Sequence, residues 1–243
     1  MLRKLNLAAL ALLLGCASNN APPPASAPAT ATEMEPLHAV MQQHFVHLDD
    51  LQKAVIAGDL TLAKQSAQWV MDHHVEVRNE GWKPHLAKLE EAAAHVTQAP
   101  DLMQASVGAA RVAGSCGSCH EAHGIRMHFG AVPAAEGDDT RAHMKRHQWA
   151  ADRLWDAVVG NSDAVWNEAT TALSDAPLHL ADGREGPTDL ALEMINEAAE
   201  VVHRVGEQGE QTKGRDARVQ ALGEFLSTCA ACHSQLGIDP EAQ

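Results

Sequence analysis

Two segments of the chain carry the same arrangement of two cysteines and a histidine. Each reads Cys-x-x-Cys-His, and the residues are Cys116, Cys119 and His120 in the first segment and Cys229, Cys232 and His233 in the second. In an α-helix, residues at positions i, i+3 and i+4 share one face. Each segment would therefore present two thiols and an imidazole side by side, with only small residues between the thiols.

This spacing suits the covalent attachment of haem. Two thiols one helical turn apart can add to the two vinyl groups of one porphyrin, and the adjacent imidazole can then bind the iron. The sequence therefore predicts two covalently bound haem c groups, attached through Cys116 and Cys119 and through Cys229 and Cys232. His120 and His233 are the predicted axial iron ligands.

Two other kinds of site use similar residues. A thioredoxin-like redox pair also uses Cys-x-x-Cys, but in a βαβ setting, and no strand pattern is visible in this sequence. A single Cys₂His₂ zinc site needs its ligand pairs close together in sequence, whereas these motifs start at Cys116 and Cys229.

The fifth cysteine follows a secretory signal. Arg3 and Lys4 precede an apolar run over residues 5–14, which is too short to span a bilayer and ends in Gly15-Cys16. This ending resembles the lipobox of bacterial lipoproteins, which implies cleavage before Cys16 and lipidation of its thiol and amine. We expect residues 1–16 to be the signal peptide with its lipobox cysteine.

A tether follows the lipidation site. Residues 17–34 are rich in Pro and Ala, and residues 19–32 contain no charged side chain. This composition favours an extended chain over a buried core. The resemblance implies a protein anchored by lipid to the membrane on the periplasmic side of the cell envelope. Ala17 stands where Asp would indicate inner-membrane retention, which is compatible with the outer membrane.

The charge of the chain bears on its partners. The formal net charge is -14 at pH 7, and removal of the signal peptide takes away two further positive charges. Such an acidic chain is not expected to bind nucleic acid, which requires basic patches. It suits docking on redox partner proteins with a basic surface, although a solvated acidic surface without a partner accounts for the charge equally well.

The chain contains an internal repeat. Residues 41–57 (MQQHFVHLDDLQKAVIA) and 144–160 (MKRHQWAADRLWDAVVG) match at Met, His, Asp, Leu, Ala and Val with an offset of 103. The two Cys-x-x-Cys-His motifs have an offset of 113, so the second copy contains about ten extra residues. We expect them in the glycine-containing connections at residues 181–187 and 206–214.

Each copy is expected to form four helices. The chain is rich in Ala, Leu, Glu and Gln and has no Tyr, which favours helix throughout. Breaks at Gly and Pro residues place the helices of the first copy at about 35–57, 60–77, 84–98 and 101–124. Those of the second are expected at about 140–157, 163–174, 187–205 and 215–236. The predicted domains are residues 35–130 and 138–243, each an up-down bundle.

The position of the motif indicates a family. Each motif closes its repeat on the fourth helix, and the run Met41-Gln-Gln-His44-Phe45 resembles the first helix of class II cytochromes c. The chain thus resembles a tandem duplication of cytochrome c′, which implies an all-α fold of two four-helix bundles and, by analogy with the family, a homodimer. It departs from the family after the haem histidine, where Tyr-Arg is replaced by His123-Gly124 and Leu236-Gly237.

The sixth ligand of each iron decides between functions. In the family, as the resemblance implies, an apolar residue of the first helix leaves the iron open to small gases, and Met closes it. Apolar residues at helical spacing in the first helix place Met41 and His44 on the face that points towards the predicted haem, and the same pattern in the second copy places Met144 and His147 there. Met41 and Met144 are the leading candidates for distal ligands, and His44 and His147 are rivals. A register one turn earlier would place His38 and Arg141 there.

The function expected from these residues is periplasmic electron transfer by a membrane-tethered di-haem c-type cytochrome, which is not an enzyme. The alternative is a five-coordinate haem protein that binds NO or CO. A peroxidase-like enzyme, with His44 and His147 as acid–base groups, comes third.

Overall fold

The computed structural model of the chain describes residues 31–73, 80–137, 139–174 and 189–237. All regular secondary structure within these ranges is helical, so the all-α prediction is confirmed. The α-helices are α1 (Ala31–Ala57), α2 (Leu60–Asp72), α3 (Lys83–Thr97), α4 (Leu102–Ala122), α5 (Thr140–Gly160), α6 (Asp163–Leu173), α7 (Asp189–Gln208) and α8 (Arg215–Leu236). Two 3-10 turns, Glu80–Trp82 and Gly209–Gln211, precede α3 and follow α7.

The N-terminal predictions fall mostly outside the described residues. The signal peptide, Cys16 and most of the tether lie there. Helix α1 begins at Ala31, inside the range 17–34 that the composition assigned to the tether.

The first helices of the two repeats end in the same way. Gly58 and Asn161, which are equivalent at the offset of 103, both have positive φ angles, 77° and 49°. This left-handed conformation stops a helix, and Gly and Asn are the residues that adopt it most readily. The next residue then caps the following helix, because Asp59 accepts a hydrogen bond from the Leu62 backbone N–H and Ser162 from that of Val165.

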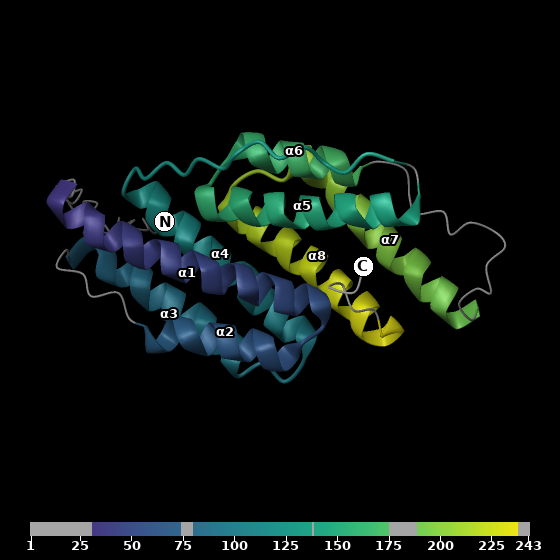
Figure 1. Cartoon of the computed structure of the whole chain (residues 1–243), viewed down its shortest axis with the longest axis horizontal. Helices are drawn as coiled ribbons and strands as arrows, with labels where there is room; N and C mark the ends of the chain where they lie inside the picture. Colours follow the sequence, from purple (N-terminus) through teal and green to yellow (C-terminus); the bar gives the residue numbers. More distant parts are fainter. Residues whose placement is uncertain (1–30, 74–79, 138, 175–188, 238–243) are drawn as a thin grey trace, which may run out of the picture.

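The helices form two sets that share one core. Helices α1–α4, the first half, pack in a ring in chain order, and helices α5–α8, the second half, do the same. Figure 1 shows α8 passing through the middle of the molecule between helices of the two halves. The closest packing between halves is that of α4 on α8, and α4 also packs on α5 as α1 does on α8.

Helices α4 and α8 cross in antiparallel directions. Arg215 at the start of α8 forms an ion pair with Glu121 at the end of α4, with an N–O distance of 2.7 Å. At the centre of the crossing, Gly223 faces Ala110, and these two residues are equivalent at the motif offset of 113. The two halves are therefore related by an approximate two-fold axis that passes close to this pair.

The ten extra residues of the second copy lie between α6 and α7. Helices α2 and α6 start at positions that differ by 103. Equivalent cavity-lining residues of the third helices, α3 and α7, and of the fourth helices, α4 and α8, differ by 113. The prediction of an insertion at residues 206–214 is wrong, because the offset of 113 already holds in α7, before these residues, and is unchanged in α8, after them. The other predicted location, residues 181–187, is outside the described residues.

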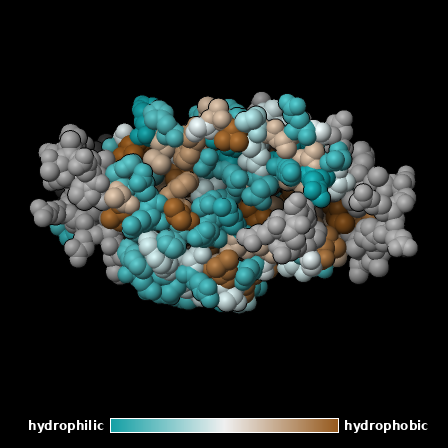
Figure 2. All heavy atoms as spheres, viewed as in Figure 1, coloured by the Kyte–Doolittle hydropathy of each residue, from teal (hydrophilic) through white to brown (hydrophobic). Residues whose placement is uncertain are grey.

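The described surface is mainly polar. Figure 2 shows hydrophilic side chains over most of the visible face, with hydrophobic ones scattered between them. The large apolar side chains that are exposed are Val46, Leu62, Met103, Met127 and Val132. Within the described ranges, no helix combines the length and hydropathy needed to cross a membrane.

A partly buried carboxyl group joins the first helices of the two halves. Asp152 on α5 accepts hydrogen bonds from the Nε2 atoms of Gln148, at 3.1 Å, and of Gln52 on α1, at 3.4 Å. Burial raises the pKa of Asp152 to about 6, although the two amide hydrogen bonds oppose this shift.

This raised pKa predicts a pH-dependent effect of Asp152→Asn. The folded protein keeps the proton of Asp152 at pH values where the unfolded chain has lost it, so this group destabilises the fold as the pH rises from about 4 to 7. Asn retains the accepting oxygen and cannot ionise. The free energy of unfolding, measured by denaturant titration at pH 4 and pH 8, should shift in favour of the variant by about 1–2 kcal/mol between these pH values.

The exposed Asp216 provides the control, and Asp216→Asn should show no such shift. A difference between Asp152→Asn and the native chain that is the same at both pH values would contradict the raised pKa.

Candidate functional site

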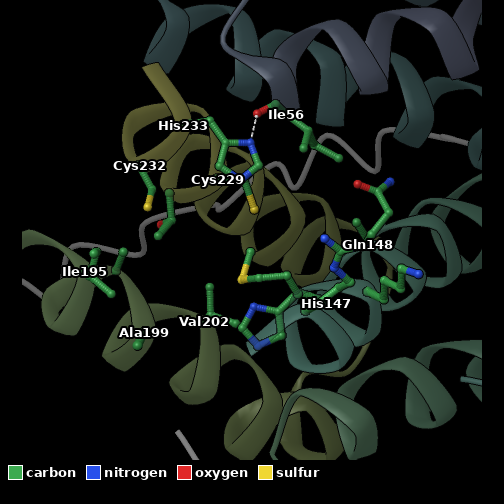
Figure 3. A pocket seen from close by; sticks show the side chains of 15 residues that line it. Ile56, His147, Gln148, Ile195, Ala199, Val202, Cys229, Cys232 and His233 are labelled. Atoms are coloured by element: carbon green, nitrogen blue, oxygen red, sulfur yellow. Dashed lines mark hydrogen bonds between the residues drawn. The ribbon is translucent and has the colours of Figure 1, made fainter. Parts of the chain in front are cut away.

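The second motif opens onto a cavity of about 190 Å³ between α5, α7 and α8. Figure 3 shows Cys229, Cys232 and His233 on α8 along one side of the cavity, with His147 from α5 opposite them and α7 along the edge. The first motif opens in the same way onto a cavity of about 60 Å³ between α1, α3 and α4. In each half, the two thiols and the imidazole thus face one space, as their spacing predicts.

The two cavities are built from equivalent residues. Beyond the motifs, six pairs of lining residues correspond at the repeat offsets, namely Met41 and Met144, Trp82 and Ile195, His85 and Ala198, Leu86 and Ala199, Leu89 and Val202, and Ser115 and Thr228. The repeat was found in the sequence without reference to any cavity. The agreement shows that one site has been built twice.

The cavities differ in size because their walls differ in side-chain volume. The first cavity is lined by Trp82 and Leu86 where the second has Ile195 and Ala199. Trp82 is 8% exposed and packs against His123, with ring centroids 5.1 Å apart.

Each motif imidazole is held by the opposite half of the molecule. The Nδ1 atom of His120 lies 2.8 Å from the backbone oxygen of Val159 on α5, and the Nδ1 atom of His233 lies 2.7 Å from that of Ile56 on α1. Ile56 and Val159 are equivalent at the offset of 103. A carbonyl oxygen can only accept, so Nδ1 carries the proton in both rings and Nε2 keeps a lone pair for a metal.

Burial favours the neutral form of these imidazoles. It lowers the pKa of His120 and of His233, and the hydrogen bonds to the two carbonyl oxygens only partly oppose this effect. A neutral imidazole with Nδ1 oriented by a backbone carbonyl is the usual state of a histidine that binds a metal.

The thiols are also held in their neutral form. Burial raises the pKa of Cys116 and of Cys229 to about 12, and it raises the pKa of Cys119 and Cys232 as well. Catalytic Cys-x-x-Cys pairs have the opposite property, a lowered pKa that supplies a thiolate. The environment of the four thiols therefore argues against a thioredoxin-like function.

Among the distal candidates, only the methionines occupy equivalent positions in both cavities. Met41 lines the first cavity and Met144 the second. His147 and Arg141 line the second cavity, but their counterparts His44 and His38 do not line the first.

The first-half rivals have other environments. The Nε2 atom of His44 lies 2.9 Å from the backbone oxygen of His73, and the ring of His44 meets Trp69 edge to face. His38 is exposed.

Two features of the sites were not anticipated from the sequence. The carbonyl groups of Ile56 and Val159 belong to the opposite repeat, and a backbone atom leaves no signature in a residue pattern. His143 and His203 gather beside His147 within the second half, although the i, i+4 spacing of His143 and His147 could have indicated a pair on one helix face.

Comparison with protein-family models, with curated proteins and with solved structures gives no match. The function is therefore inferred from the residues of the chain itself.

The close approach of α4 to α5 predicts a cost for Gly117→Ala. A Cβ atom at Gly117 would overlap the backbone oxygen of Val158, next to the carbonyl that holds His120. Since backbone cannot yield as a side chain does, we expect the free energy of unfolding to fall by about 1–3 kcal/mol, measured by guanidinium denaturation followed by circular dichroism.

Gly130 provides the matched control, because a Cβ atom there would meet nothing within 4 Å. Gly130→Ala should change the stability by less than about 0.5 kcal/mol. Equal stability of the Gly117→Ala variant and the native protein would show that α4 does not pack against α5 at this point.

Proposed function

We propose that the protein is a di-haem c-type cytochrome that transfers electrons, built as two fused four-helix units of the cytochrome c′ type. The observation that carries this proposal is the pair of equivalent cavities, each with two thiols and an imidazole on one wall and a methionine among its lining residues. A haem attached in each cavity supplies reversible one-electron chemistry through its iron.

The residues present fit a covalently attached haem. Cys116 and Cys119 are separated by one helical turn on α4, and neutral thiols of this spacing are the groups that add to two vinyl substituents. His120 keeps the lone pair of Nε2 for the iron because Nδ1 is bound to the Val159 oxygen. Leu86 and Leu89 contribute apolar walls that favour the porphyrin plane.

The methionines favour electron transfer over gas binding. Met41 and Met144 are the distal candidates common to both cavities, and a thioether ligand would close the sixth position and raise the reduction potential relative to a second imidazole. Electron transfer requires no open coordination site, whereas binding of NO or CO does.

The proposed partners follow from charge and from the N-terminus. A net charge of -14 favours docking on redox proteins with a basic surface, since opposite charges increase the rate of encounter. Lipidation at Cys16 would hold the protein at a membrane facing the periplasm, and residues 17–34 would give it reach between partners.

Haem attachment can be tested by mass. Protein produced in a host with haem-ligating machinery should carry two haems, measured by intact mass and by the absorption of the pyridine haemochrome. Replacing both Cys116 and Cys119 by Ser should leave one haem, and the same change at Cys229 and Cys232 should also leave one, because each pair serves a separate cavity.

Ser118→Ala, which changes a motif residue without a role in attachment, should retain two haems. A colourless native protein, or a mass equal to that of the polypeptide alone, would refute the proposal.

The distal ligands can be tested by Met41→Leu and Met144→Leu, which conserve side-chain volume. Each variant should turn one of the two haems high-spin and able to bind CO, and the reduction potential of that haem should fall by on the order of 100 mV because the thioether is lost. Optical spectra with CO titration and a redox titration provide the measurements.

The exposed Met103 gives the control, and Met103→Leu should leave spectra and potentials unchanged. Stoichiometric CO binding by the native protein would instead favour the gas-binding function. The larger second cavity is the observation in favour of that alternative.

A further inference from the structure

We propose that the second half holds a divalent transition metal ion of the zinc class, bound by His143 and His147 on α5 and His203 on α7. One ring nitrogen of each residue lies within 4.8 Å of those of the other two. This site is separate from the Cys-x-x-Cys-His motifs, and its three imidazoles come from α5 and α7, the two helices that lie diagonally opposite in the ring of the second half.

The geometry of the three rings matches such a site. The ring centroid of His147 lies 4.2 Å from that of His143 and 5.7 Å from that of His203. The centroids of His143 and His203 are 5.8 Å apart. Tetrahedral zinc with Zn–N bonds of about 2.0–2.1 Å brings its nitrogen ligands to about 3.3 Å from one another. The three ring nitrogens already lie within 4.8 Å of one another, so each pair would have to close by about 1.5 Å at most.

Ring nitrogens of His147 and His203 are also left without protein partners. The Nε2 atom of His147 and both ring nitrogens of His203 are buried and make no hydrogen bond. Buried polar atoms are normally paired with a hydrogen-bond partner. His203 is only 8% exposed, so most of its surface is covered by other protein atoms. A metal ion would use one lone pair of each ring.

The charge state of the cluster is compatible with a cation. Burial, with His143 and His203 beside it, lowers the pKa of His147 to about 3, so this ring is neutral and its lone pair is available. Arg146 on α5 adds to this lowering of the pKa, and its guanidinium donates to the Gly137 oxygen at 2.6 Å.

The first half does not repeat the site. The positions equivalent to His143, His147 and His203 are Val40, His44 and Glu90, and His44 is bound to the backbone oxygen of His73. The proposal relies on the proposed function in one respect, since His147 is free for this site only if Met144 and not His147 is the distal iron ligand.

The test uses the full-length haem-containing protein after removal of loosely bound metal with EDTA. Titration with zinc sulfate, followed by calorimetry and by elemental analysis of zinc and iron, should give one zinc per chain. His203→Leu, which fills the same buried space without a ligand, should weaken zinc binding by about 100-fold or more, the upper end of the effect known for outer-shell partners. His203 does not line the haem cavity, so the haem spectrum should not change.

His95→Leu is the matched control, because it removes one exposed imidazole from α3 and should leave zinc binding as it is. X-ray absorption at the zinc edge should show about three imidazole nitrogens at about 2.0–2.1 Å. Zinc binding that is the same in His203→Leu as in the native chain, or a native chain with normal haem content that takes up no zinc, would overturn the site and leave the haem proposal standing. Absence of haem would refute the proposed function separately.

Discussion

The antiparallel crossing of α4 and α8 is the constraint on which the rest of the structure depends. Gly223 faces Ala110 at its centre, and a Cβ atom at Gly114 would meet Val219 of α8. Helices with small residues at the crossing can approach closely. This approach brings each motif helix against the first helix of the other half, where the carbonyl groups of Ile56 and Val159 receive the motif imidazoles.

The consequence is that neither candidate haem site is complete within its own repeat. The ring of His233 is oriented by α1 and that of His120 by α5. A change in how the halves pack would therefore alter the imidazoles of both sites together. The two repeats are separate units in the sequence, but they form a single core in which ligand orientation depends on both.

The repeats have since diverged around this common frame. Trp82 and Leu86 fill the first cavity, and their smaller counterparts widen the second. The second half also gathers His143, His147 and His203, while the equivalent His44 has its own backbone partner. The two equivalent sites thus differ in their surroundings, and the proposed haems, if bound there, would differ in reduction potential.

The sequence by itself determined the helices, their caps and the shared face of each Cys-x-x-Cys-His motif, because these depend on residues within one or two turns of each other. The repeat also indicated that Met41 and Met144 occupy equivalent positions. Only the tertiary structure decided that His120 binds the Val159 oxygen, that His44 turns to His73, and that His203 lies beside His147. Such contacts join residues far apart in the chain, and no local periodicity records them, because they depend on how whole helices pack.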